Sequence, residues 1–189
     1  MEPPVLTRHR RPFLAPFWVM WLLLLVLLAA AFVAYRSATS ATTTTVVLVR
    51  HAEKELVTID DPPLSAAGER RAERLAQIFG DVRGVGRIDG LYVTATRRTQ
   101  QTAMPLAARL GVKPEVVPAG GDLEALVSSA LRKHRGGRVL IIGHTSTIPE
   151  LIEKLSGQTV PAIGEDEYDN IYVITVPTFG KSNVLRLKY

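Results

Sequence analysis

The stretch Val46-Val47-Leu48-Val49-Arg50-His51-Ala52-Glu53 decides the fold of this chain. Its first four residues are β-formers, with the length and composition of a strand that is buried on both faces. The run then breaks into a cation and an imidazole, Arg50 and His51, which do not help a hydrophobic core. Such groups are typical of the rim of a sheet, where loops after strands gather catalytic and anion-binding side chains. The dipeptide alone fits equally well an ordinary strand that ends in two polar residues. Only the rest of the chain can distinguish this reading from a functional site at the edge of the sheet.

The composition is that of a globular protein: of 189 residues, 47% are hydrophobic and 22% charged. This length allows one ordinary domain with an appendage. The net charge is only +5, and no Lys/Arg cluster interleaved with aromatic residues indicates a nucleic-acid surface. The chain has no cysteine, which excludes disulfides, thiolate catalysis and cysteine-based zinc sites.

The appendage is a hydrophobic segment, residues 13–35, that contains no charged residue. A helix of this length, rising about 1.5 Å per residue, spans the roughly 30 Å hydrocarbon core of a bilayer. Trp18 and Trp21 lie towards one end and Tyr35 at the other, as interfacial aromatics do. A cleavable signal peptide is the alternative, because small residues follow at 37–41. The length of the apolar run favours a retained transmembrane anchor.

The charges beside this segment predict its orientation. Three arginines precede it and one closely follows it: Arg8, Arg10, Arg11 and Arg36. The positive-inside rule then makes residues 1–12 a cytoplasmic tail and puts the remainder of the chain on the far side. We therefore expect a single-pass membrane protein with an extracytoplasmic working domain, or a secreted protein if the segment is cleaved.

Strands and helices alternate in the rest of the chain. Residues 36–45 are rich in Ser, Thr and Ala and read as a linker, and residues 46–189 form the folded domain. Helical spacing of apolar residues recurs around Leu75, Leu106 and Val127. Further strands are expected at 88–93, 116–117, 139–142, 171–176 and 184–188, and a further helix at 147–155. This alternation predicts an α/β fold, a three-layer α/β/α sandwich with a mostly parallel sheet.

Three of the predicted strands end in polar groups that a core rejects. These groups are Arg50 and His51 after the first strand, Arg97 and Arg98 after the second, and His144 after the strand at 139–142. In a parallel sheet the carboxyl ends of the strands lie on one edge, so the groups can converge. Guanidinium forks bind phosphoryl oxygens bidentately, and a neutral imidazole can attack phosphorus. The set therefore describes a pocket for a dianionic phosphoryl group.

At these residues the chain resembles the histidine phosphatase superfamily, the phosphoglycerate mutase-like group. Four stretches carry the resemblance in the family's order: residues 50–53, 64–68, 94–103 and 143–149. They are similar to the family's "RHG" signature, its "LT-x-x-G" helix entry, its "S-P-x-x-R-A-x-x-T-A" segment and its second-histidine motif. The departures, Ala52 for glycine, Thr94 for serine and Thr99 for alanine, remove no chemical group that the mechanism needs.

The resemblance implies a phosphatase that works through a covalent phosphohistidine and uses no metal or cofactor. His51 would be the nucleophile, and Arg50 and Arg98 would hold the phosphoryl oxygens. His144 would complete the pocket and stabilise the charge that develops in transfer. The motif spacing selects Arg98 as the pocket arginine and makes Arg97 a surface neighbour.

The general acid, which protonates the leaving oxygen, is the least determined part. Family members often place it between the second arginine motif and the second histidine, where Glu115, Asp122 and Glu124 are available. We take Asp122 as the candidate, because Gly120-Gly121 lets it lie in a rim loop; the alternative is that it only caps the following helix. Glu53, beside the pocket, is a second candidate.

We therefore expect a membrane-tethered phosphomonoester hydrolase that acts on a phosphorylated small molecule or a phosphoprotein. The alternatives are a phosphoglycerate mutase, a phosphohistidine phosphatase, or a phospholigand-binding protein without turnover. The short stretch between Arg98 and His144 leaves little room for a substrate-enclosing insertion and disfavours the mutase. An extracytoplasmic domain disfavours the phosphohistidine phosphatase, and the complete set of pocket residues disfavours the binding protein.

Overall fold

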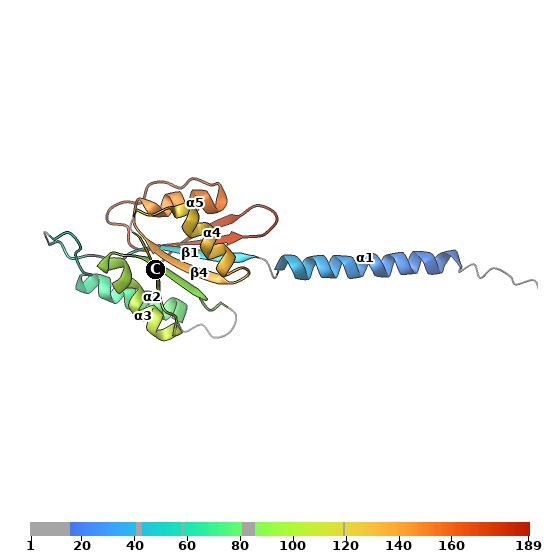
Figure 1. Cartoon of the computed structure of the whole chain (residues 1–189), viewed down its shortest axis with the longest axis horizontal. Coiled ribbons are helices and arrows are strands. Elements are labelled where there is room, and N and C mark those ends of the chain that lie inside the picture. Colours follow the sequence, from blue (N-terminus) through green and yellow to red (C-terminus); the bar gives the residue numbers. More distant parts are fainter. Residues whose placement is uncertain (1–15, 41–42, 58, 81–85, 119) are drawn as a thin grey trace, which may run out of the picture. The chain divides into compact units, whose positions relative to one another are not determined.

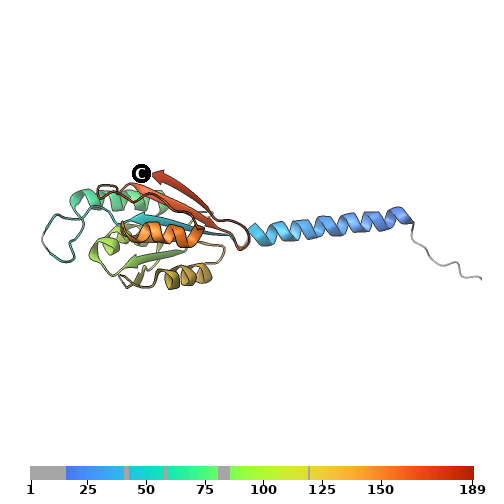
Figure 2. The same cartoon turned by 90° about the horizontal axis from the view of Figure 1, so that it is seen from above.

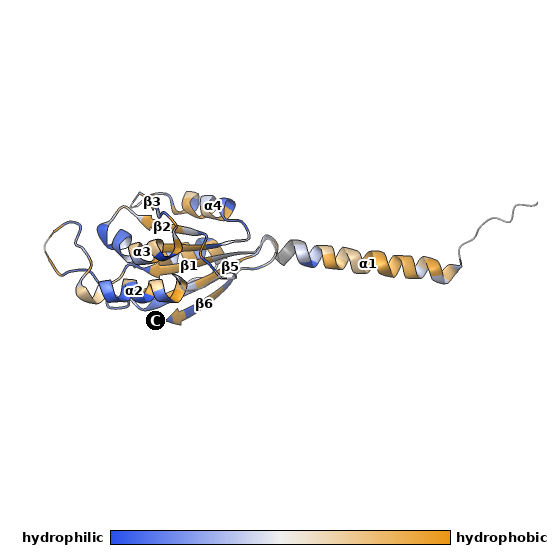
Figure 3. Cartoon of the chain, turned by 90° about the horizontal axis from the view of Figure 1, so that it is seen from below, coloured by the Kyte–Doolittle hydropathy of each residue, from blue (hydrophilic) through white to orange (hydrophobic). Residues whose placement is uncertain are grey.

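The computed structural model describes residues 16–40, 43–57, 59–80, 86–118 and 120–189. The chain divides into two compact units, Met1–Ala38 and Thr39–Tyr189. The first contains all but the last two residues of helix α1 (Phe17–Ser40), of which Phe17–Ser37 is long and apolar enough to cross a membrane. Figure 3 shows hydrophobic residues all around most of this helix. Residues 13–15 of the predicted anchor lie outside the described residues.

The predicted linker at 36–45 is only partly irregular, which corrects the expectation. Helix α1 continues through Ser40, and the first strand begins at Thr44. The small residues after Tyr35 include alanine, the best helix former, so nothing in this segment forces the helix to stop where its hydrophobicity does.

The second unit is built on one six-stranded sheet (Figure 1). In chain order its strands are β1 (Thr44–Arg50), β2 (Gly90–Thr94), β3 (Glu115–Val117), β4 (Arg138–Gly143), β5 (Asn170–Val176) and β6 (Asn183–Lys188). The order across the sheet is β3-β2-β4-β1-β5-β6. Strands β1 to β4 run parallel, β5 is antiparallel to its neighbour β1, and β6 at the edge is antiparallel to β5 (Figure 2). The mostly parallel sheet is as expected.

Two helices cover each face of the sheet and complete the three predicted layers. They are α2 (Ala66–Gly80) and α3 (Arg97–Leu110) on one face, and α4 (Leu123–Lys133) and α5 (Thr147–Ser156) on the other. In β1 the side chains alternate between two cores. Val46 and Leu48 pack with α4 and α5, whereas Val47 and Val49 pack with α2 and α3. Because all four are at most 3% exposed, β1 is the central strand that the apolar run predicted.

The helix α3 begins earlier than its apolar pattern suggests. Its first residue is Arg97, so Pro105 lies in the helix interior rather than in the first turns. A proline there removes one backbone hydrogen bond, a cost that the burial of Leu106 and Leu110 beside it offsets. This early start matters for function, because it places Arg98 in the first turn, directly behind the end of β2.

Candidate active site

The carboxyl ends of β1, β2 and β4 lie level with one another. Arg50 pairs in register with Gly143, and Val93 pairs with Ile142, so the residues that follow each strand share one edge of the sheet. The backbone N–H of His51 continues the ladder by donating to the Gly143 carbonyl oxygen at 3.0 Å. The predicted convergence of the polar groups is therefore built into the strand register.

His51 is held as a neutral imidazole with a defined tautomer. It is only 4% exposed, and its Nδ1 lies 2.8 Å from the carbonyl oxygen of Ala52. Because a carbonyl only accepts, Nδ1 carries the proton and Nε2 keeps its lone pair. Burial, opposed by that hydrogen bond and aided by the charges of Arg98 and Arg50, lowers the pKa of His51 to about 3. The ring is thus unprotonated across the physiological range.

His144 lies beside His51 and is also neutral. The two ring centroids are 5.3 Å apart in an edge-on arrangement, and Thr94 at the end of β2 contacts His144 Nε2 at 2.9 Å. Burial and the charges of Arg98 and Arg50 lower the pKa of His144 to about 4. A neutral imidazole can donate a hydrogen bond to a phosphoryl oxygen without a charge of its own.

A loop that precedes β5 fixes the guanidinium of Arg50. Its Nη1 lies within hydrogen-bonding distance of the carbonyl oxygens of Gly164, Glu165 and Glu167, at 2.9, 2.7 and 3.3 Å. Its Nη2 contacts the Glu165 carboxylate at 3.3 Å, and the guanidinium lies 4.0 Å from the ring centroid of Tyr168. Since Arg50 is 3% exposed, these partners offset the cost of burying its charge.

Arg98 lies in the pocket and Arg97 on the surface, as the motif spacing predicts. The Arg98 side chain is 19% exposed, and its Nη1 lies 3.4 Å from a carboxylate oxygen of Asp61. The same carboxylate accepts from the backbone N–H of Arg97, whose side chain is exposed. Asp61 therefore ties the loop after β1 to the start of α3.

Both pocket arginines have one buried donor left over. Within the described residues, the Nε atoms of Arg50 and Arg98 are buried and have no hydrogen-bond partner. Unpaired buried donors are uncommon and call for an explanation. A tetrahedral oxyanion between the two guanidinium groups would accept a hydrogen bond from both. The pocket is therefore suited to bind an oxyanion.

The other motif residues hold the loops in place. Thr102 Oγ1 accepts from the backbone N–H of Ala52 at 3.0 Å, which ties α3 to the residue after the nucleophile. Gly68 faces the carbonyl oxygen of Glu53 so closely that a Cβ atom there would lie 2.1 Å from it. These structural contacts explain why the two motifs have threonine at Thr102 and glycine at Gly68, and neither residue needs a role in the chemistry.

The acids named from the sequence lie in structural contacts. Asp122 accepts from the backbone N–H groups of Glu124 and Ala125 and so caps α4, the alternative that we left open. Glu53 forms an ion pair with Arg71 at 2.7 Å, and Glu115 pairs with Lys133. Glu124 lies 3.5 Å from Lys154. None of these contacts tests the general-acid role, which for Asp122 stays a prediction.

Three residues of the site were missed from the sequence: Asp61, Glu165 and Tyr168. Tyr168 lies 6.0 Å from the His51 ring as well as against Arg50. They belong to loops whose sequences match no motif, and only the folded chain brings them to the pocket. Among the described residues, no three His, Asp or Glu side chains are grouped so that they could hold a metal ion.

Comparisons with known proteins agree with the site. The family model described as histidine phosphatase superfamily (branch 1) matches residues 46–119. A PE-PGRS family protein of Mycobacterium tuberculosis is 34% identical over 67 residues, 35% of this chain but only 11% of that protein. This chain thus spans a small part of the curated relative that it matches.

Solved structures share the fold. The protein histidine phosphatase SixA complexed with tungstate has a TM-score of 0.63 at 21% identity, covering 76% of this chain and 96% of that one. A mycobacterial glucosyl-3-phosphoglycerate phosphatase has a TM-score of 0.58 at 17% identity, covering 70% of this chain and 90% of that one. The family model covers the residues that carry Arg50, His51 and Arg98, and the solved structures show that the folded domain has the fold of the histidine phosphatase superfamily.

Proposed function

We propose that this chain is a phosphomonoester hydrolase that works through a phosphohistidine on His51. The observation that carries the proposal is the pair of buried, unpartnered Nε donors of Arg50 and Arg98 beside two neutral histidines. Positive charge with free donors favours a phosphoryl dianion, and a neutral ring supplies the nucleophile.

The proposed reaction has two displacements. The lone pair on His51 Nε2 attacks phosphorus while the bond from phosphorus to the leaving oxygen breaks, and that oxygen takes a proton from a general acid. Water then attacks phosphorus and gives a proton to the deprotonated acid, the P–N bond breaks and returns the lone pair to His51 Nε2, and inorganic phosphate leaves. Arg50, Arg98 and His144 stabilise the charge on the equatorial oxygens in both steps. Because guanidinium groups supply the positive charge, neither step needs a metal ion, and activity is expected to persist with a chelator.

Asp61 is better placed than Asp122 to be the general acid. Its carboxylate lies 3.4 Å from Arg98, whereas that of Asp122 caps α4. It is also partly open to solvent, with a side chain that is 39% exposed, so that it can exchange protons.

The Asp61→Asn variant is expected to lose activity in proportion to the basicity of the leaving group. General acid catalysis contributes roughly 10²- to 10⁴-fold, so kcat for an alkyl phosphate should fall by about 10²-fold or more. For p-nitrophenyl phosphate, whose leaving group needs no proton, the fall should be less than about 10-fold. Steady-state kinetics with both substrates measure the difference.

Two asparagine variants serve as controls for that experiment. Asp60→Asn alters the exposed neighbour, and Asp122→Asn alters the acid first named from the sequence. A selective loss with alkyl phosphate in Asp122→Asn, and none in Asp61→Asn, would return the acid to Asp122.

The pH dependence of kcat/KM follows from the lowered pKa values of the histidines. In the free enzyme His51 titrates at about 3 and His144 at about 4, so each is neutral above those values and gains a proton as the pH falls through them. Because kcat/KM reports groups of the free enzyme, we expect no loss of kcat/KM from histidine protonation between about pH 8 and about pH 5, after correction for the ionisation of the substrate phosphate. A protonation of the enzyme with a midpoint near 6.5 that limits kcat/KM would show that His51 is solvated like a free imidazole.

The physiological substrate is either a phosphorylated small molecule or a phosphoprotein. A phosphohistidine phosphatase activity is a second candidate, because the compact domain covers 96% of the SixA structure without a large insertion. Phosphohistidine peptides, sugar phosphates and phosphoglycerates should therefore be compared on the purified chain. Interconversion of phosphoglycerates without release of phosphate would instead indicate a mutase.

We further propose that α1 anchors the chain in a membrane with the catalytic domain outside the cytoplasm. The support is the apolar span Phe17–Ser37 and the three arginines before it, against Arg36 alone after it. A reporter enzyme that is active only outside the cytoplasm, fused after Tyr189, should be active in cells. Activity of a strictly cytoplasmic reporter at the same position would reverse the orientation.

A further inference from the structure

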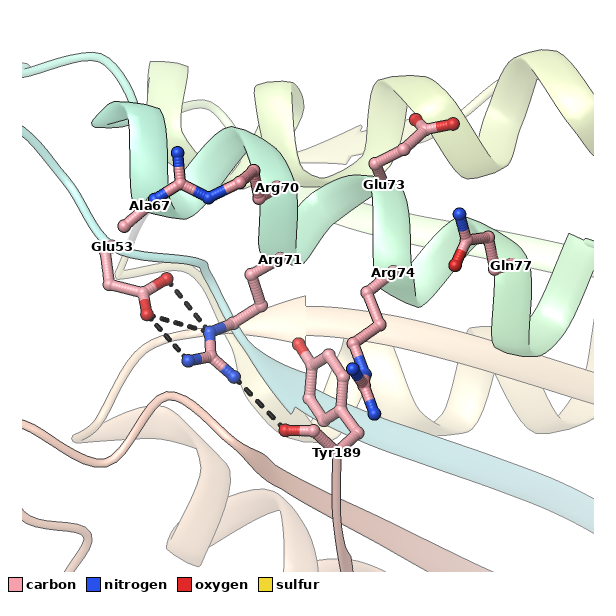
Figure 4. A pocket seen from close by; sticks show the side chains of 8 residues that line it. All are labelled: Glu53, Ala67, Arg70, Arg71, Glu73, Arg74, Gln77 and Tyr189. Atoms are coloured by element: carbon pink, nitrogen blue, oxygen red, sulfur yellow. Dashed lines mark hydrogen bonds and ion pairs between the residues drawn. The ribbon is translucent and has the colours of Figure 1, made fainter.

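A second hollow lies outside the catalytic pocket, along α2 (Figure 4). Its volume is about 600 Å³, within the range of sites for small molecules. Three arginines of α2 line it, Arg70, Arg71 and Arg74, together with Glu53 and Tyr189. None of the four residues that converge at the catalytic pocket takes part.

The acids of the hollow are already neutralised. Glu53 pairs with Arg71 at 2.7 Å, and Glu73 pairs with Arg109 of α3 at 2.6 Å. Arg71 is held further by a backbone carboxylate oxygen of Tyr189, the last residue of the chain, at 3.3 Å. Within the described residues, neither Arg70 nor Arg74 makes a hydrogen bond or an ion pair. These two side chains therefore leave the hollow with a net positive charge.

The spacing of the arginines makes this arrangement unfavourable on its own. Arg70 and Arg74 are four residues apart on the helix, and Arg71 and Arg74 are three apart, so like charges lie on one face. Like charges at these spacings destabilise a helix. A bound anion would relieve that repulsion and gain bidentate hydrogen bonds from the guanidinium groups.

The Tyr189 side chain forms one wall of the same hollow (Figure 4). Its phenol oxygen is buried away from solvent, so a ligand in the hollow meets the ring and not the hydroxyl. The Arg71 guanidinium lies 5.5 Å from the ring centroid, which fixes one wall beside the two free cations.

We propose that this hollow is a second anion site, which binds a phosphate ester through Arg70 and Arg74. The volume exceeds what a phosphate group alone fills, so the ligand carries an organic part that lies against Ala67 and the Tyr189 ring. The phosphate ester belongs either to a soluble molecule or to an anionic lipid headgroup. The proposal does not depend on turnover at His51.

The test counts bound inorganic phosphate by equilibrium dialysis of the full chain in phosphatidylcholine nanodiscs. Wild type is expected to bind two phosphates per chain and Arg70→Gln/Arg74→Gln one. Arg132→Gln/Arg135→Gln, which removes the same charge from two exposed residues outside the hollow, should still bind two. Circular dichroism checks that every variant is folded.

Arg98→Gln separates this proposal from the proposed function. It should lose the phosphate of the catalytic pocket and keep the one at Arg70 and Arg74. If wild type and Arg98→Gln both bind one phosphate and Arg70→Gln/Arg74→Gln binds none, the anion site stands and the catalytic pocket fails. Phosphate binding in Arg70→Gln/Arg74→Gln equal to that of wild type overturns the second site.

Nanodiscs that also contain phosphatidylglycerol distinguish the two sources of the ligand. If the lipid headgroup fills the hollow, wild type should bind one fewer phosphate in these discs than in phosphatidylcholine alone. Equal binding in both discs assigns the hollow to a soluble phosphate ester. Each result supports the site and differs only in the molecule that carries the phosphate.

Discussion

Replacing His51 by alanine is expected to lower kcat/KM for p-nitrophenyl phosphate by on the order of 10⁴-fold or more, as the loss of a covalent nucleophile does in other enzymes. The reason is geometric. Nδ1 is committed to the Ala52 carbonyl oxygen, so Nε2 is the lone pair presented to the pocket. His144, whose Nε2 contacts Thr94, has no lone pair oriented towards the pocket in this way, and neither has a water molecule. The measurement is release of p-nitrophenol by the full chain in detergent.

The control for this variant is His134→Ala. His134 lies against Gly90 at the amino end of β2, away from the edge that carries the pocket. Its removal should leave kcat/KM of the folded protein within a few-fold of wild type. Activity of His51→Ala within about 10-fold of wild type would contradict the nucleophile.

Replacing Arg98 by glutamine is expected to lower kcat/KM by roughly 10²- to 10³-fold, the cost of removing one preorganised donor to a developing oxyanion. Arg98 supplies a buried Nε without a partner and a full positive charge close to both histidines. Glutamine keeps much of the side chain's length but loses the charge and the bidentate fork. The loss should appear in kcat as well as in KM, because charge on the equatorial oxygens persists through the transfer.

Arg97→Gln is the matched control, with the same substitution one residue earlier. Its side chain is exposed, and its contact to Asp61 runs through the backbone N–H, which glutamine retains. We expect a change of less than about 3-fold, as for surface substitutions away from special features. The opposite ranking, with Arg97→Gln more impaired than Arg98→Gln, would mean that the motif had been read in the wrong register.

The sequence predicted best what depends on local pattern. The apolar run of β1 and its polar end were readable because a buried parallel strand excludes Arg50 and His51 from its core. Helix faces around Leu75 and Leu106 followed from their spacing. Arg98 was separated from Arg97 by the spacing of the family motif. The two differ in exposure because one residue rotates a helical side chain by about 100°.

What the sequence could not supply are contacts between distant loops. Arg50 and the carbonyl oxygen of Glu165 are 115 residues apart in the chain, and Asp61 is 37 residues from Arg98. Neither loop has a periodicity, since its residues follow no helix or strand. For Asp122 the sequence left two interpretations open, a rim loop after two glycines and a helix cap; the structure shows the cap, and the general-acid role stays a prediction. The anion site on α2 likewise needed Tyr189 to be seen beside Arg71 (Figure 4).

Trapping the covalent intermediate tests the central claim most directly. The full chain is mixed with ³²P-labelled aryl phosphate, quenched in alkali, digested and analysed by mass spectrometry, with His51→Ala as the control. The account predicts one labelled peptide that contains His51, whose label survives alkali and is released by acid, as a phosphoramidate bond requires, and no label in the variant. Rapid release of phosphate with the label on another residue, or with no labelled peptide at any time during turnover, would contradict it.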